Sequence, residues 1–129
     1  MSDLQFLQEK PYACTNLTML TDFYELTMAN GFLESGKGDQ IVYFDMFFRR
    51  IPDGGGYAIM AGVEQLIDYL SHLHFTDTDI AYLRGKGLFC EKFLDYLAHF
   101  EFCCDVWAIP EGTPIFPHEP IVTVRGPAI

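Results

Sequence analysis

The stretch "IVYFDMFFRRIPDGGGYAIMAGVEQLIDYL", residues 41–70, contains the three kinds of local structure from which we predict the fold. Residues 41–50 read as a strand because apolar side chains alternate between two faces. Residues 51–57 read as a turn, since a proline, an aspartate and three glycines sustain neither a strand nor a helix. Residues 58–73 then have the spacing of an amphipathic helix with one apolar stripe. The stretch therefore predicts a strand, a turn and a helix in succession.

The alternation in the predicted strand gives it a core face and a face that carries polar groups. The predicted core face is Val42, Phe44, Met46 and Phe48, and the opposite face is Ile41, Tyr43, Asp45, Phe47 and Arg49. On the polar face, Asp45 could hold the guanidinium of Arg49 while the guanidinium fork stays free for a phosphate oxygen. The alternative is that Arg49 and Arg50 are only solubility charges at the end of a strand.

Upstream, residues 21–33 predict a helix that is apolar on two opposed faces. Asp22 is the expected N-cap, and Glu25 has the spacing of a capping box. At about 100° per residue, the apolar side chains fall into two sets. One set is Phe23, Leu26 and Leu33, and the opposite set is Tyr24, Met28 and Phe32.

The rest of the chain predicts two short helices followed by two strands. Thr76 and Asp79 open a helix that runs to about Arg84, and "GKG", residues 85–87, ends it. Phe89, Phe93, Leu97 and Phe100 mark the next helix. The segments "CDVWAI" and "IVTVRG" read as strands on either side of the proline-rich residues 110–120. The order of elements predicts an α+β fold, with residues 1–129 as one domain.

Composition excludes several classes of function. Half of the 129 residues are hydrophobic, which is enough for a packed core. Eighteen acidic against eight basic residues give a formal charge of -10, which repels nucleic acids and anionic membranes. The sequence contains no secretory signal pattern and no apolar run of membrane-spanning length. We therefore expect a soluble protein of the cytoplasm. The apolar end at "RGPAI" suggests that the polypeptide was cut or that more of it follows.

Several residue types that often carry chemistry lack the required pattern. The four cysteines are Cys14, Cys90, Cys103 and Cys104, which we expect to be buried or incidental thiols. The four histidines are His72, His74, His99 and His118, and none has metal-site spacing with a carboxylate. The glycine runs lack the pattern of a phosphate loop and are expected to be turns. Glu111, in a loop among prolines, either orients a ligand or caps a turn, and we favour the cap. No nucleophile is predicted.

Four separated motifs resemble a known family. They are "LTDFYELTMANGF" at residues 20–32, "FDMFFRRIPDGGGYAIMAGVEQLIDYL" at 44–70, "FLDYL" at 93–97 and "AIPEGTPIFPHEPIVTVRGP" at 108–127. Together they are similar to the N-terminal part of nicotinate phosphoribosyltransferase. The resemblance implies an N-terminal α/β sandwich-type domain of a type II phosphoribosyltransferase, without the irregular barrel domain that carries most of the active site. It also implies a sheet completed by later chain, so we expect an exposed sheet edge and an apolar patch here.

The resemblance implies an enzyme of NAD biosynthesis. Such an enzyme joins nicotinate to phosphoribosyl pyrophosphate with release of pyrophosphate, coupled to ATP hydrolysis and assisted by Mg²⁺. It would be a head-to-tail homodimer, with each active site between the barrel of one subunit and the N-terminal domain of the other. The phosphorylated histidine and the determinants of nicotinate preference would lie outside this chain, and the 129 residues alone would be inactive.

The resemblance also implies substrate-binding residues on this chain. Tyr24 occupies the tyrosine position of the "D-x-Y" motif, where the ring would stack on nicotinate across the dimer interface, with Asp22 in the same motif. An arginine after the "FFR" strand would approach phosphate groups, and strand alternation favours Arg49 with Arg50 behind it. A rival interpretation treats the chain as a complete, non-catalytic interaction module that dimerises through its first helix.

Overall fold

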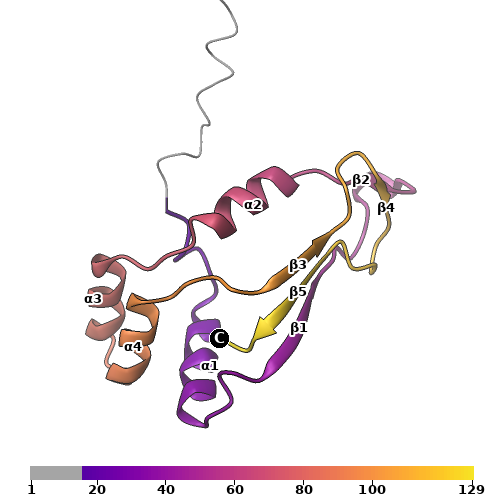
Figure 1. Ribbon diagram of the computed structural model, residues 1–129. Helices are drawn as coiled ribbons and strands as arrows, with labels where there is room; N and C mark the ends of the chain where they lie inside the picture. Colours follow the sequence, from indigo (N-terminus) through magenta and orange to yellow (C-terminus); the bar gives the residue numbers. More distant parts are fainter. Residues whose placement is uncertain (1–15) are drawn as a thin grey trace, which may run out of the picture.

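The computed structural model describes residues 16–129, which form the mixture of helices and strands that the sequence predicts (Figure 1). The helices are α1 (Phe23–Glu34), α2 (Val63–Ser71), α3 (Asp77–Gly85) and α4 (Glu91–Ala98), with a 3-10 turn at Pro52–Gly54. The strands are β1 (Ile41–Met46), β2 (Ala58–Ile59), β3 (Asp105–Ala108), β4 (Pro114–Ile115) and β5 (Val122–Pro127). Within residues 16–129, no helix combines the length and the apolar character needed to cross a membrane.

Helices α1, α3 and α4 pack together and are called the helical cluster below. Its buried core is Leu26, Ile80, Leu83, Phe93, Leu94 and Leu97. The predicted capping box of α3 is confirmed: the Thr76 hydroxyl accepts a hydrogen bond from the Asp79 N–H at 3.2 Å, and the Asp79 carboxylate accepts one from the Thr76 N–H at 2.8 Å. Gly87, with φ of 66°, turns the chain out of α3 as the glycine-lysine-glycine pattern predicts.

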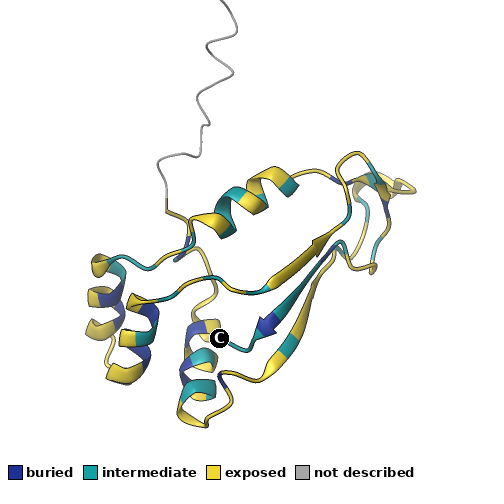
Figure 2. Ribbon diagram, in the orientation of Figure 1, coloured by how far each residue is buried: buried dark blue, intermediate teal, exposed yellow. Residues whose placement is uncertain are grey.

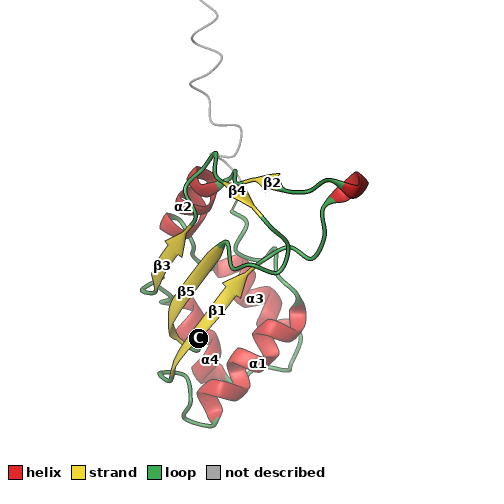
Figure 3. Ribbon diagram, turned by 90° about the vertical axis from the view of Figure 1, so that its right-hand side faces the viewer, coloured by secondary structure: helices red, strands yellow, loops and turns green. Residues whose placement is uncertain are grey.

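The larger sheet has the strand order β1-β5-β3, and both pairings are antiparallel. The register places Tyr43, Arg125 and Asp105 in one row across the three strands. The next row on this face is Asp45, Thr123 and Trp107. The opposite face, called the apolar sheet face below, includes Val42, Phe44, Met46, Val122, Val124 and Val106. The predicted alternation of β1 is thus confirmed. Figure 3 shows these three strands side by side.

The burial predicted for the core face of β1 is wrong within the described chain. The Phe44 side chain is 62% exposed and Met46 is also exposed, while Val42 and Phe48 are only half-buried. The helices lie beside the sheet without covering this face at β1, and Figure 2 shows β1 and β3 largely exposed. The expected apolar patch and exposed sheet edge are therefore both present, because β1 and β3 each have a neighbour on one side only.

The helix predicted over residues 58–73 begins five residues later than expected. Residues Ala58–Ile59 form β2, which pairs with β4 in a second, two-stranded sheet that the sequence did not predict. Gly62, with φ of 101°, then redirects the chain into α2. Met60, Ile115 and Val122 form a second buried core here, which joins the small sheet to the end of β5.

Candidate functional site

Helix α1 presents Tyr24 and Met28 to solvent because its other side is fixed to the helical cluster. Leu26 is buried in that core, and the Phe23 ring meets the Phe89 ring edge-on at 5.7 Å. Asn30 is also buried there, and its side-chain oxygen accepts a hydrogen bond from the Cys90 N–H at 3.1 Å. These contacts set the rotation of α1 about its axis.

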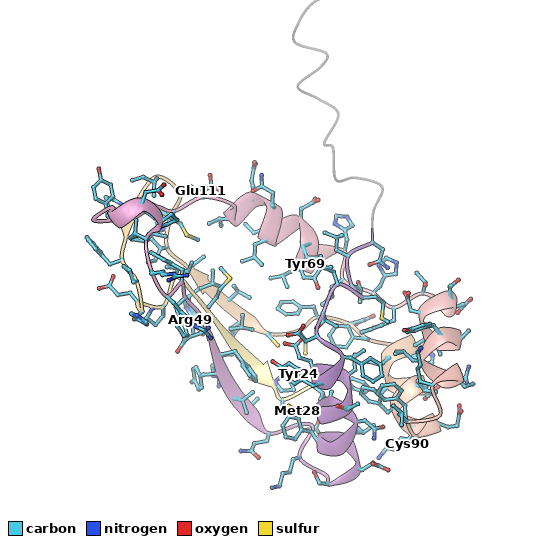
Figure 4. All side chains as sticks on the ribbon, turned by 180° about the vertical axis from the view of Figure 1, so that it is seen from behind. Tyr24, Met28, Arg49, Tyr69, Cys90 and Glu111 are labelled. Carbon is cyan, nitrogen blue, oxygen red and sulfur yellow. The ribbon has the colours of Figure 1, made fainter. Side chains whose placement is uncertain are left out.

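The second face of α1 therefore remains available to a neighbouring molecule. The Tyr24 side chain is 58% exposed and that of Met28 is 51% exposed. Figure 4 shows both labelled on one side of α1, away from Cys90 at the start of α4. The prediction of a helix with two apolar faces is thus confirmed: one face packs within the chain, and the other carries an exposed aromatic ring.

The start of α1 differs in detail from the predicted capping box. Asp22 is the N-cap, but its side chain makes no capping hydrogen bond. Glu25 instead accepts a hydrogen bond from the Thr21 hydroxyl. Asp22 is exposed and lines an open depression of about 440 Å³ together with Leu20, Thr21 and Glu25.

The charge of Glu25, which lines this depression, also acts on Tyr69 of α2. Partial burial raises the pKa of the Tyr69 hydroxyl, and the negative charge of Glu25 raises it further. A second open cavity of about 780 Å³ is lined by apolar residues of α2, of the segment after α4 and of β3, together with Ser71, His72, His74 and Glu101.

Arg49 and Arg50, called the arginine pair below, follow the end of β1 and are both exposed. The prediction that strand alternation reaches Arg49 is wrong, because β1 ends at Met46. The predicted contact between Arg49 and Asp45 is also absent, and Asp45 accepts a hydrogen bond from the Thr123 hydroxyl at 2.6 Å. Among the described residues, neither arginine forms an ion pair.

The structure places the four predicted site residues in two separate groups. Asp22 and Tyr24 lie at the start of α1, and the arginine pair lies beyond the end of β1 (Figure 4). No hydrogen bond or ion pair within residues 16–129 joins one group to the other. A ligand that used both groups would have to bridge them, or the groups would serve different molecules.

Arg125 is a cation that the sequence reasoning missed. Its guanidinium donates to the Tyr43 hydroxyl at 3.0 Å and to the Asp105 carboxylate at 2.9 Å. These two hydrogen bonds, first that with Tyr43, raise the pKa of Arg125. The contacts tie all three strands together on the face opposite the apolar sheet face. Pairing "CDVWAI" with "IVTVRG" could have suggested the contact, but the sequence does not fix their register.

Glu111 has a capping role, as favoured, but it caps the start of helix α2 and not a turn. Its carboxylate accepts hydrogen bonds from the N–H groups of Gly62 and Val63 at 3.0 Å and 2.8 Å. These are N–H groups at the start of α2, which lack partners within the helix. The side chain is committed to this structural role, and Figure 4 shows it beside the loop that leads into α2.

The described residues offer no assembled metal site. Within residues 16–129, no three side chains of His, Cys, Asp or Glu lie together as metal ligands would. Cys90, Cys103 and Cys104 are free thiols, and burial, as the largest cause, raises the pKa of Cys104. Cys14 lies outside the described residues.

The observations above define an α+β domain with an uncovered sheet face and an exposed ring on its first helix. Comparison with known proteins shows its family. Residues 19–129 match the family described as the nicotinate phosphoribosyltransferase (NAPRTase) N-terminal domain. The chain belongs to this family.

Relatives of this chain in distant organisms are called nicotinate phosphoribosyltransferase. A nicotinate phosphoribosyltransferase of Mycobacterium tuberculosis is 42% identical over 111 residues, which is 86% of this chain and 24% of that protein. Its counterpart in Bacillus subtilis is 36% identical over 114 residues, covering 88% of this chain and 23% of that protein.

The crystal structure of human nicotinic acid phosphoribosyltransferase is similar to this fold, with a TM-score of 0.74 and 33% sequence identity. The match covers 83% of this chain and 22% of the human chain. This chain thus spans about a quarter or less of the length of these relatives.

Proposed function

We propose that this chain is the N-terminal segment of a nicotinate phosphoribosyltransferase and supplies substrate-binding side chains to a site shared between two subunits. The complete enzyme would convert nicotinate and phosphoribosyl pyrophosphate to nicotinate mononucleotide and pyrophosphate, with hydrolysis of ATP, in NAD biosynthesis. The family match over residues 19–129 is the single observation that carries the proposal. The domain would act in a head-to-tail homodimer.

The exposed ring of Tyr24 supports its part in this proposal. A tyrosine that stacks on nicotinate from across an interface must be uncovered in its own subunit and held at a fixed angle. Tyr24 meets both needs, because its ring is more than half exposed and the opposite face of α1 is packed against α4. An electron-poor pyridine ring is stabilised by an aromatic face without any change in charge. Asp22, beside it at the N-cap, would contact the same substrate.

The proposed reaction depends on positioning and on charge. The ring nitrogen of nicotinate forms a bond to C1 of the ribose as the bond from C1 to the pyrophosphate oxygen breaks, so C1 becomes positive and the leaving group takes the electron pair. Holding nicotinate in line with C1 lowers the activation barrier of the reaction, because the reacting atoms are already oriented. The exposed arginine pair would stabilise phosphate or pyrophosphate oxygens by charge-assisted hydrogen bonds. Mg²⁺ and ATP belong to the proposal for the complete enzyme, with no step assigned to residues of this chain.

The test compares Tyr24→Ala with Tyr24→Phe in the complete enzyme. We expect Tyr24→Ala to raise the KM for nicotinate by roughly tenfold, since a ring–ring contact is lost, and Tyr24→Phe to have a much smaller effect. Tyr82→Ala is a matched control, because Tyr82 is a similarly exposed tyrosine on α3. Steady-state kinetics with each substrate varied in turn gives the answer. An unchanged nicotinate KM and kcat in Tyr24→Ala would reject the stacking role.

A further inference from the structure

We propose that His118 is a positioning residue for the arginine pair, holding the chain after β1 so that Arg49 and Arg50 meet the phosphate groups of the substrate. The inference rests on the proposed function, in which the arginine pair binds phosphoribosyl pyrophosphate. Sequence reasoning found no role for His118, because no spacing connects it to another functional residue. The connection is made by the fold, which brings the turn before β5 alongside the end of β1.

The backbone pairing continues past the end of β1 and stops next to the arginine pair. The Ile121 N–H donates to the Met46 carbonyl at 2.8 Å, and the His118 N–H donates to the Phe48 carbonyl at 2.9 Å. The second of these hydrogen bonds ends on the residue immediately before Arg49. His118 is therefore the last point at which the neighbouring chain fixes the backbone leading into the arginine pair.

His118 makes this contact in an unusual backbone conformation. Its φ is 65°, and among the non-glycine residues in the described range 16–129 only Asp53, at 57°, is also left-handed. Asp53 lies in the turn that follows the arginine pair, so these two residues stand at the two loops around it. Left-handed non-glycine residues are uncommon and gather at functional sites, although aspartate and histidine adopt this conformation more readily than most residues.

Side-chain packing fixes the same segment from two sides. The His118 ring lies 6.1 Å from the Phe47 ring, with the planes inclined at 39°. Phe48 packs against the second buried core, formed by Met60, Ile115 and Val122. The arginines that follow make no ion pair within residues 16–129. Their guanidinium groups are thus placed by the backbone before them, which His118 holds.

The experiment compares His118→Ala with His118→Asn in the complete enzyme. Alanine disfavours the left-handed conformation, whereas asparagine tolerates it, and both variants keep the backbone N–H donor. We expect His118→Ala to raise the KM for phosphoribosyl pyrophosphate by about fivefold to tenfold, with kcat and the nicotinate KM changed by less than about twofold. His118→Asn should restore the first KM to near the wild-type value. His99→Ala, at an exposed histidine after α4, is the matched control.

A double-variant comparison tests whether His118 acts through the arginines. When Arg49→Ala and Arg50→Ala are already present, adding His118→Ala should have little further effect on the KM for phosphoribosyl pyrophosphate. An equal rise in the KM of both substrates, or no recovery in His118→Asn, would mean that His118 only supports the fold and would overturn the inference. If His118→Ala does not fold, His118→Gly replaces it, and a wild-type KM in both Gly and Asn variants supports the backbone role.

The two levels of the proposal fail in different ways. Wild-type enzyme that neither turns over nor binds phosphoribosyl pyrophosphate with Mg²⁺, by kinetics and by titration calorimetry, would remove the proposed function and the positioning role with it. Wild-type turnover with an unchanged KM in His118→Ala would remove only the positioning role.

Discussion

The helical cluster and the three-stranded sheet differ in how completely the chain covers its own apolar surface. Six apolar residues are buried between α1, α3 and α4, and three of them, Leu83, Phe93 and Leu94, are fully enclosed. On the apolar sheet face, Phe44 and Met46 of β1 and Val106 of β3 remain exposed. The helical cluster is thus finished by its own residues, whereas the sheet has one apolar face that its own helices leave open.

The difference separates the part that stabilises the domain from the part that serves the proposed site. Buried apolar area supplies most of the folding free energy, so the helical cluster should dominate stability. Large exposed apolar patches mark surfaces that meet another molecule. The exposed face of α1, the arginine pair and the apolar sheet face all lie outside the core of the helical cluster.

The largest expected effect is the difference in stability between two substitutions that each remove one ring, one in the helical cluster and one in the sheet. In the 129-residue chain, Phe93→Ala should reduce the free energy of unfolding by about 3–5 kcal/mol, because it opens a cavity around a fully buried ring. Phe44→Ala should cost no more than about 1 kcal/mol, because its ring is already mostly in contact with water. Urea denaturation followed by circular dichroism measures both.

The same pair of variants shows what the apolar sheet face is for. Equal losses in the 129-residue chain would contradict the contrast between the two regions. In the complete enzyme, Phe44→Ala should become more destabilising than in the shorter chain, since the remaining polypeptide or the second subunit is proposed to cover the sheet. A cost that stays equally small in both polypeptides would mean that the face is open in the enzyme as well.

The helices could be predicted from sequence because their signals are local. The Thr76 and Asp79 pair lies three residues apart, and the apolar spacing of Phe93 and Leu97 needs no knowledge of distant chain. The alternating faces of β1 were predictable for the same reason. Tyr24 could be placed on an exposed face once the opposite face of α1 was recognised as packed.

Features that depend on pairing between distant segments could not be predicted. The β2–β4 sheet joins Ala58 to Ile115, and no local pattern shows that two such short segments pair. Thr123 donates a hydrogen bond to the Asp45 carboxylate from across the sheet, and no local pattern shows this contact. Burial of β1 failed for another reason: alternation shows which side chains share a face but not whether another layer covers it.

A smaller effect should come from the capping box of α3. Thr76→Ala removes the side-chain acceptor for the Asp79 N–H and should lower the free energy of unfolding by about 1 kcal/mol. Thr78→Ala is the matched control, since Thr78 lies in the same turn, is exposed, and makes no side-chain hydrogen bond within the described chain. Thermal denaturation of the three proteins gives the comparison. Equal shifts at the two threonines would show that helix propensity, not capping, accounts for the change.

The smallest effect is expected for the ion pair between α3 and α4, which belongs to the helical cluster but lies on its surface. The Arg84 guanidinium contacts the Glu91 carboxylate at 3.0 Å, and this hydrogen bond lowers the pKa of Glu91. A carboxyl group whose folded pKa is depressed stabilises the fold above its unfolded pKa, and the contribution is lost as the pH falls through the folded pKa. Because both side chains are exposed, solvent screens the pair.

Carboxyl NMR titration should show the Glu91 pKa rising towards its usual value in Arg84→Met, while the denaturation midpoint at neutral pH hardly changes. A large loss of stability in Arg84→Met would show that the surface of the helical cluster, and not only its buried core, holds these helices together.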